Sequence, residues 1–200
     1  MERAGVGALA RALLEAGALK FGRFTLTSGR QSAYYIDLRV LPSYPSYFRL
    51  ALRAYASVLS RLLPFHALCS IPTSGLIFAS ALAYRLRLPL AYVRKEERAH
   101  GLRRALEGRL ERGWSVVLLD DVATTGGSLL AAARAVRAAG AEVRAAVVLV
   151  DRLEGARRAL GEEGVELHAY CDVLSLARAL ASEGRLGPSE LSAIEGQLGG

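Results

Sequence analysis

The stretch Val116-Val-Leu-Leu-Asp-Asp-Val-Ala-Thr-Thr-Gly-Gly-Ser128 decides the predicted fold, because it takes a buried strand directly into charged and small residues. Its four leading residues are apolar and two of them are β-branched, which predicts a strand buried on both faces. Asp120 and Asp121 then stand at the carboxyl end of that strand. The hydroxyl and glycine residues at 124–128 allow backbone N–H groups to converge on an anion, so this strand end predicts a phosphate site.

A helix is predicted directly after this site. Residues 129–139 are mostly Ala, Leu and Arg, which are strong helix formers. The positive end of the helix dipole would therefore point at the residues that hold the phosphate. A generic strand–turn–helix with an N-cap is the alternative, since Asp, Thr and Ser are also the usual capping residues. The nucleotide-binding patterns GxxxxGK[ST] and GxGxxG are both absent from the sequence.

Strand-like and helix-like segments alternate along the rest of the chain. Apolar runs or alternating patterns predict strands at residues 20–29, 33–39, 67–71, 88–93, 142–152 and 165–170. Helical spacing predicts helices at residues 2–16, 46–63, 76–87, 153–163 and 173–183, with a short one after Gly187 and breaks at Pro42 and Pro45. The short connections indicate an α/β fold with a parallel central sheet flanked by helices.

Four of the predicted strands end in residues that suit a ligand. These ends are at residues 72–75, 94–98, 120–121 and 151–152. Ligands of open parallel sheets bind at the carboxyl ends of the strands. We therefore expect the four ends to meet in one crevice and to form a single active site.

The composition favours one soluble domain with anionic partners. The chain has 200 residues, 52% of them hydrophobic, which is enough for one core and short for two. Its formal charge of +7 fits nucleic acid or a small polyphosphate, and only residues 94–104 form a dense basic cluster. No apolar run approaches the ~20 residues that a membrane helix needs, and the first residues lack the order of a secretory signal. We expect a cytoplasmic protein that does not bind a membrane.

The two cysteines, Cys69 and Cys171, are expected to be buried free thiols. They lie in separate apolar segments without CxxC spacing, which argues against a metal site or a disulfide. His66 and His168 are likewise expected to be structural.

Residues 120–128 resemble the 5-phosphoribosyl-1-pyrophosphate (PRPP) motif of type I phosphoribosyltransferases. Two carboxylates suit ribose hydroxyls or a hydrated cation, and backbone N–H groups suit a phosphate. The resemblance implies that PRPP is bound by the following residues: Thr73, Ser74, Gly75, Asp120, Asp121, Val122, Ala123, Thr124, Thr125, Gly126, Gly127 and Ser128.

The basic segment Arg94-Lys-Glu-Glu-Arg-Ala-His-Gly101 would, by composition alone, be interpreted as a solvated loop. Preceded by Tyr92-Val, it resembles the catalytic loop of orotate phosphoribosyltransferases, and Glu107-Gly108 resembles the end of that loop. A cationic loop that closes over departing pyrophosphate stabilises the developing negative charge and excludes water. The resemblance implies catalytic roles for Arg94, Lys95, Arg98 and His100, together with Asp120 and Asp121.

Two further segments resemble the acceptor side of the same family. Phe24-Thr-Leu-Thr-Ser-Gly-Arg-Gln-Ser-Ala-Tyr-Tyr-Ile-Asp37 resembles the N-terminal hood, and Asp151-Arg-Leu-Glu-Gly155 resembles the segment whose Arg contacts orotate. Core packing is the alternative for Tyr34 and Tyr35. The resemblance implies that orotate is bound by Ser28, Gly29, Tyr35, Ile36, Thr124 and Arg152.

The resemblance covers residues 20–155 in the family's order. It implies a single phosphoribosyltransferase domain over residues 1–200, in which residues 1–40 form a small hood. The implied reaction transfers the phosphoribosyl group from PRPP to orotate, giving orotidine 5′-phosphate and pyrophosphate in pyrimidine (UMP) biosynthesis. Mg²⁺ would be carried mainly by PRPP, with contact to Asp120 or Asp121 only through water. A homodimer that shares the loop at 94–108 across its interface, and binds no nucleic acid, is also implied.

Three positions depart from many relatives, which carry Lys where this chain has Thr27, Ser74 and Arg98. Arg keeps the charge of Lys but transfers protons poorly, so we expect Arg98 to stabilise charge and His100 to serve in acid–base chemistry. Two alternatives remain open. A purine phosphoribosyltransferase would differ in the hood, and a PRPP-sensing RNA-binding regulator on the same fold would suit the net charge but could dispense with the loop at 94–101.

Overall fold

The computed structural model describes residues 2–25, 29, 31–94 and 106–199. Two compact units make up the chain. One consists of Met1–Arg53 with Cys171–Gly200, and the other of Ala54–Tyr170.

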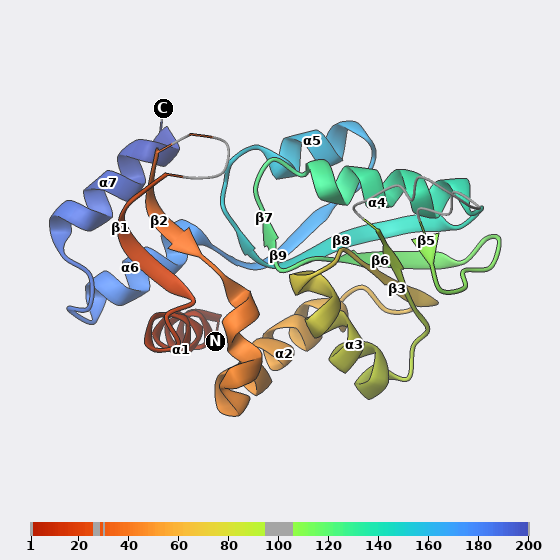
Figure 1. Cartoon of the computed structure of the whole chain (residues 1–200), viewed down its shortest axis with the longest axis horizontal. Helices are drawn as coiled ribbons and strands as arrows, with labels where there is room; N and C mark the ends of the chain where they lie inside the picture. The colour runs from red at the N-terminus through yellow and green to blue at the C-terminus, as the bar shows by residue number, and fades with distance from the viewer. Residues whose placement is uncertain (1, 26–28, 30, 95–105, 200) are drawn as a thin grey trace. The chain divides into compact units, whose positions relative to one another are not determined.

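The unit Ala54–Tyr170 is built on a seven-stranded sheet (Figure 1). In chain order the strands are β3 (Ala67–Ser70), β4 (Leu90–Val93), β5 (Leu106–Glu107), β6 (Ser115–Leu119), β7 (Val122–Ala123), β8 (Glu142–Asp151) and β9 (Leu167–Asp172). Their spatial order is β5-β4-β3-β6-β8-β7, with β9 paired to β8. The β3–β4, β3–β6, β6–β8 and β7–β8 ladders are parallel, and the β4–β5 ladder is antiparallel. The predicted α/β fold with a mostly parallel central sheet is confirmed.

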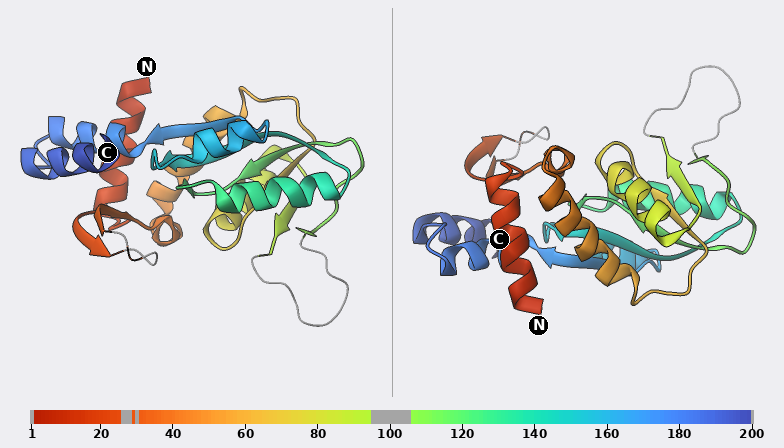
Figure 2. Two further views of the ribbon diagram at one scale, coloured as in Figure 1. Left: turned by 90° about the horizontal axis from the view of Figure 1, so that it is seen from above. Right: turned by 90° about the horizontal axis from the view of Figure 1, so that it is seen from below.

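Helices cover both faces of this sheet. They are α3 (Ser74–Leu86), α4 (Gly127–Ala138) and α5 (Ala156–Glu162). Helices α4 and α5 lie on one face, seen from above in Figure 2, and α3 lies on the opposite face, seen from below. Side chains alternate between the faces, so Cys69, Leu118 and Ala146 share a core cluster with Leu129 and Val136 of α4. Because both faces are covered, β6 is buried along four of its five residues, which explains its continuous apolar run.

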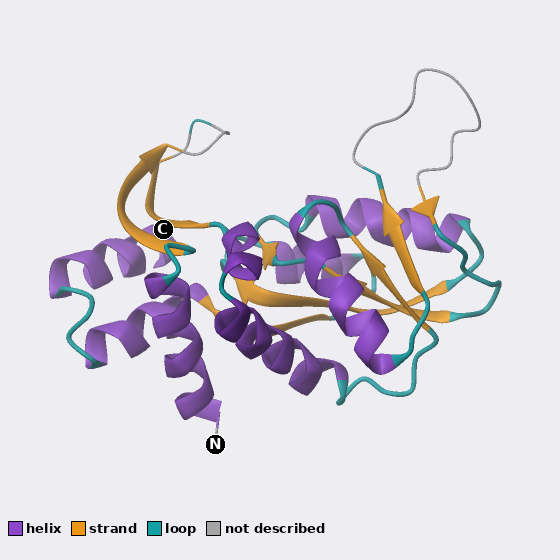
Figure 3. Ribbon diagram, turned by 60° about the horizontal axis from the view of Figure 1, so that its bottom comes forward, coloured by secondary structure: helices purple, strands orange, loops and turns teal. Residues whose placement is uncertain are grey.

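The unit of Met1–Arg53 and Cys171–Gly200 combines an antiparallel hairpin with helices (Figure 3). Its elements are α1 (Glu2–Glu15), β1 (Leu19–Thr25), β2 (Gln31–Ile36), the 3-10 helix η1 (Leu38–Ser43), the start of α2 (Pro45–Leu59), α6 (Val173–Ser182) and α7 (Pro188–Gly199). Helix α1 packs against α6, and α7 packs against β2. Ion pairs join Arg11 to Glu183 and Arg185 to Glu15. The C-terminal helices therefore share a core with the predicted hood, an association that the sequence analysis did not predict.

The structure differs from the sequence predictions at short or proline-containing segments. Strands β5 and β7 have two residues each, too few for a periodic pattern to appear. Pro45, predicted as a break, is the first residue of α2, where a helix has no use for the N–H that proline lacks. Pro42 lies within η1, which is capped by Asp37. The Arg39 guanidinium, hydrogen-bonded to Asp37, holds the pKa of that carboxyl below its usual range.

Both cysteines are free and buried, as predicted. Burial raises the pKa of the Cys69 thiol to about 12 and also raises the pKa of Cys171. His66 likewise has a structural place, since its Nδ1 accepts the N–H of Ser115 at 3.0 Å and its ring stacks on Trp114. Among the helices of the described ranges, none combines the length and the apolar character needed to cross a membrane.

Candidate active site

The sheet has a topological switch point between its neighbouring strands β3 and β6. Helix α3 leads from β3 to β4 on one side, whereas α4 leads from β6 to β8 on the other. Adjacent parallel strands whose connections leave in opposite directions open a crevice at their carboxyl ends. The turn at 72–75 follows β3 and the two aspartates follow β6, so both begin at this place. Strands β4 and β8 flank the pair, which puts all four predicted strand ends on one edge of the sheet.

Gly75 brings the two central strand ends into contact. A Cβ on Gly75 would lie 2.7 Å from Oδ1 of Asp120 and 2.9 Å from its Cα. No side chain tolerates such an approach, so glycine is required here for space rather than for an unusual backbone angle. The predicted pyrophosphate turn is therefore packed directly against the first carboxylate of the predicted PRPP motif.

Hydrogen bonds hold the backbone at Asp120 on several sides. Its N–H donates to the carbonyl of Val147 at 3.1 Å, and its carbonyl accepts from the Tyr55 hydroxyl at 2.8 Å. Its Oδ1 accepts the N–H of Asp121 at 2.9 Å. Both carboxylates are half-buried. The position of Asp120 is consequently fixed by the protein itself, which is what a site needs if it is to hold a ligand in one orientation.

The residues after the carboxylates line a cavity of about 350 Å³. Its lining consists of Asp120, Val122, Ala123, Thr124, Thr125, Gly126, Gly127, Ser128 and Leu129. Gly126 has a φ of 87° and is the N-cap of α4, where it makes no side-chain capping bond. The first amides of a helix need hydrogen-bond acceptors, and an anion supplies them well. The predicted phosphate residues thus form one concave surface at the N-terminus of a helix.

Arg152, predicted to contact the acceptor, is tied to this cavity by a short ladder. Strand β7 pairs in parallel with the end of β8. The N–H of Arg152 donates to the carbonyl of Ala123 at 2.9 Å, and the N–H of Ala156 donates to the carbonyl of Thr124 at 3.1 Å. The segment that carries Arg152 is therefore in fixed register with the segment that lines the cavity.

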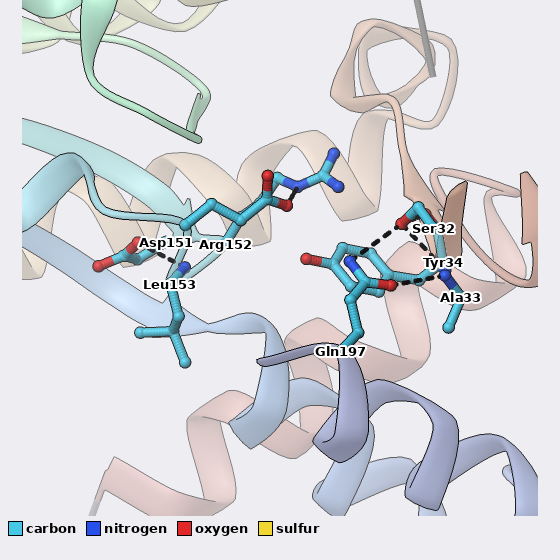
Figure 4. A network of polar contacts seen from close by, with 8 residues as sticks. Ser32, Ala33, Tyr34, Asp151, Arg152, Leu153 and Gln197 are labelled. Carbon is cyan, nitrogen blue, oxygen red and sulfur yellow. Dashed lines mark hydrogen bonds and ion pairs between the residues drawn. The ribbon is translucent and has the colours of Figure 1, made fainter. Parts of the chain in front are cut away.

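The side chain of Arg152 is buried in an ion pair. Its Nε donates to Oε1 of Glu154 at 2.8 Å, and the two side chains are only 8% and 9% exposed. Figure 4 shows Arg152 with its chain neighbours Asp151 and Leu153. The carboxylate of Asp151 accepts the N–H of Leu153 at 2.9 Å. Leu153 has a φ of 60°, which is uncommon for a residue with a side chain. Hydrogen bonds and a buried ion pair therefore hold this loop in a defined turn.

The two ends of the predicted catalytic loop are joined in the structure. Strands β4 and β5 pair, and Nη1 of Arg94 forms an ion pair with Oε1 of Glu107 at 3.0 Å. A Cβ on Gly108 would lie 2.9 Å from the Leu90 carbonyl oxygen, so only glycine allows the backbone to pass this close to β4. The other loop residues predicted to be catalytic lie outside the described residues: Lys95, Arg98 and His100.

The predicted hood residues that the structure describes lie in the other unit, at Gly29 and on β2. Tyr34 is fully buried, as core packing predicts, whereas Tyr35 and Ile36 are half-buried. The Tyr35 ring lies 5.8 Å from the Phe24 ring. Gly29 is exposed with a φ of 79°, and Ser28 and Thr27 lie outside the described residues.

Comparison with known proteins identifies the family. Residues 56–162 match the phosphoribosyl transferase domain. The chain is 45% identical to the orotate phosphoribosyltransferase of Cenarchaeum symbiosum, over 92% of this chain and 94% of that protein. This chain belongs to the orotate phosphoribosyltransferases.

Two solved structures extend this family assignment to the fold. The orotate phosphoribosyltransferase of Aeropyrum pernix superposes with a TM-score of 0.81 at 39% identity, over 90% of this chain and 99% of that one. UMP synthase of Leishmania donovani gives a TM-score of 0.86 at 36% identity. That match covers 96% of this chain but 42% of the synthase, so the phosphoribosyltransferase fold here corresponds to part of a longer protein there.

The side chains that could ligate a metal in this phosphoribosyltransferase suit a cation that arrives bound to its substrate. Among the described residues, no three His, Cys, Asp or Glu side chains gather as a metal site. Asp120 lines the cavity, and Asp121 is the next residue in the chain. Two carboxylates suit a Mg²⁺ ion that keeps most of its water and is held chiefly by phosphate oxygens.

Sequence reasoning missed several residues that position this site. Tyr55 lies within the helix predicted at residues 46–63, and its hydroxyl supports the backbone of Asp120. The buried Ser70 hydroxyl donates to the Leu119 carbonyl at 2.9 Å and joins the central strands beside the site. Glu154 lies within a motif that the sequence analysis quoted, but its pairing with Arg152 has no sequence signal beyond two opposite charges in one loop.

Proposed function

We propose that this chain transfers the phosphoribosyl group of PRPP to orotate, forming orotidine 5′-phosphate and releasing pyrophosphate. The observation that carries the proposal is the arrangement at the switch point. There, a glycine turn, two carboxylates and the cavity at the N-terminus of α4 adjoin one another in a chain of this family. Such an arrangement offers separate places for a pyrophosphate, a ribose and a 5′-phosphate.

The donor side follows from the chemistry of each group. Residues Thr124, Thr125, Gly126, Gly127 and Ser128 would bind the 5′-phosphate at the helix N-terminus. The backbone N–H groups of Thr73, Ser74 and Gly75 would bind pyrophosphate. Asp120 and Asp121 would stabilise the ribose as positive charge develops on it, a task for groups that are fixed in advance. When bound with PRPP, Mg²⁺ would neutralise charge on the leaving pyrophosphate.

The acceptor side rests on a guanidinium. Orotate carries a carboxylate, and the planar fork of Arg complements a carboxylate better than any other side chain does. The N–H of Arg152 donates to the carbonyl of Ala123, the residue before Thr124, so Arg152 and Thr124 would both contact orotate. Ser28, Gly29, Tyr35 and Ile36 would complete the base pocket, as the family resemblance implies.

The proposal includes a homodimer in the cytoplasm that shares the loop at 94–108 between subunits. In that arrangement Arg94, Lys95, Arg98 and His100 would stabilise the leaving group. The pairing of Arg94 with Glu107 supports this part, because it draws the two ends of the loop together. Sedimentation of the purified protein, followed by mixing of inactive loop and inactive cavity variants, tests whether subunits complement each other.

The direct test is orotate consumption with PRPP and Mg²⁺, measured for wild type and for Lys95→Ala. We expect turnover that requires all three components and falls in the variant. Turnover with hypoxanthine or adenine instead would point to a purine enzyme, and RNA binding without turnover would point to a regulator. Absence of orotate consumption by the folded wild type would overturn the proposal.

A further inference from the structure

The arginine proposed for the acceptor is held by a carboxylate of its own loop. We infer that Glu154 is a positioning residue for orotate: by holding Nε of Arg152 it sets the plane of the guanidinium that receives the orotate carboxylate. This inference rests on the function proposed above. It adds a residue that acts on orotate binding through Arg152.

The geometry of the pair carries the inference. Glu154 accepts from Nε at 2.8 Å, and Nε lies at the base of the guanidinium and not at its tip. Because the group is planar, fixing the Nε–H bond direction fixes the orientation of the whole fork. An unrestrained Arg side chain has about 2 kcal/mol of rotamer entropy to lose on binding a ligand, and a held one has less.

The loop is shaped so that residues 152 and 154 can meet. Asp151 is 1% exposed and accepts the N–H of Leu153 at 2.9 Å. Its other oxygen lies 3.4 Å from Nη2 of Arg157. Leu153 and Gly155 both have positive φ, which turns the chain sharply on each side of Glu154. The turn therefore places the carboxylate beside the guanidinium as part of the fold.

Burial explains why a carboxylate is needed at this position. Side chains that are 8% and 9% exposed have lost most of their hydration, and a lone buried guanidinium would destabilise the loop. Glu154 balances that charge when no orotate is bound. A base without the carboxylate, such as uracil, would gain nothing from Arg152, so the pair also supports discrimination between orotate and uracil.

The first test compares KM values for orotate and PRPP in three variants. Glu154→Ala should raise the KM for orotate about 10-fold or more, the range expected when a hydrogen bond to a charged group is lost. The KM for PRPP should stay within about twofold, since it does not depend on Arg152. Glu154→Gln keeps an acceptor for Nε and should recover much of the loss. Glu162→Ala is the control, because it removes an exposed Arg–Glu pair on α5 and should change neither constant.

The second test asks whether Glu154 acts through Arg152. In an Arg152→Lys background the fork is gone, so Glu154→Ala should have little further effect on the KM for orotate. Equal effects in both backgrounds, an unchanged KM for orotate in Glu154→Ala, or parallel losses for orotate and uracil would each overturn the inference. If Glu154→Ala fails to fold, the same comparison is made with Glu154→Asp, whose carboxylate is one methylene shorter and should hold Nε less well. Turnover of orotate by the wild type would show that the proposed function holds even if the inference about Glu154 fails.

Discussion

Gly75 and Asp120 are packed so closely that one additional carbon on the glycine would overlap the carboxylate. The relevant distances are 2.7 Å to Oδ1 and 2.9 Å to Cα of Asp120. Gly75 is the second residue of α3, where alanine would otherwise be preferred. Glycine at this position is therefore a requirement of the site and not of the helix.

Gly75→Ala should impair both activity and stability. The overlap can be relieved only by moving one of the two strand ends, and overpacking of this kind costs about 1–3 kcal/mol. We expect kcat/KM for PRPP to fall about tenfold or more and the urea midpoint to fall. Gly161→Ala is the matched control, since a Cβ at this position in α5 meets nothing within 4 Å. That variant should be as active as wild type and no less stable, and equal behaviour of the two variants would contradict the packing explanation.

Asp120→Asn and Asp121→Asn each remove a negative charge while keeping the shape of the side chain, so they test whether the charge itself is needed for catalysis. Asn at position 120 still offers an oxygen to the N–H of Asp121, so the local fold is expected to persist. Loss of a fixed charge opposite a developing charge typically costs about 10²-fold in kcat. We expect kcat to fall by about that factor and the KM for PRPP to change less. An unchanged circular dichroism spectrum would show that each variant is folded. Glu142→Gln, at the exposed start of β8, is the control for loss of one negative charge.

The site could be predicted from the sequence where the physical signal was local. Strand β6 ends in two aspartates, and burial on both faces makes such a strand a continuous apolar run that stops abruptly. The same holds for the turn after β3. Two-residue strands carry no such signal, so β7, which sets the register of Arg152 against Ala123, was not predicted.

Contacts between distant segments also could not be predicted from the sequence. The pairs Arg11–Glu183 and Arg185–Glu15 join residues about 170 positions apart, and nothing in either local pattern selects the partner. Gln197 on α7 accepts the N–H of Ala33 at 2.7 Å on the outer edge of β2, which is a backbone position without a side-chain signature (Figure 4). The hood was predicted from its motif, but its C-terminal support was not.

Gly108→Ala should destabilise the protein more than Gly113→Ala, although both glycines have positive φ. Their φ values are 92° and 78°, so both substitutions incur backbone strain of about 1–2 kcal/mol. Only at Gly108 would the new Cβ also meet backbone, 2.9 Å from the Leu90 carbonyl oxygen and 3.0 Å from the Ala91 Cα. The difference in the free energy of unfolding, measured in urea at an unchanged m value, should be about 1–3 kcal/mol. Equal losses would mean that the β4–β5 end can move without cost.

The pKa of Cys69 predicts how stability changes in alkaline solution. Burial raises the pKa of this thiol to about 12, whereas an unfolded thiol ionises near about 8.5. Between these values the folded state holds a proton that the unfolded state has lost, so stability is complete below the lower pKa and falls as pH rises. Each pH unit above about 9 should lower the free energy of unfolding by roughly 1.4 kcal/mol because of this thiol.

Comparison of wild type with Cys69→Ala between pH 8 and 10 isolates the effect, because Cys171 and all other groups are common to both. The wild type should show the steeper decline and should resist thiol reagents at pH 8 until it is unfolded. Identical slopes, or fast labelling of the native protein, would show that the thiol at position 69 is not held neutral by burial.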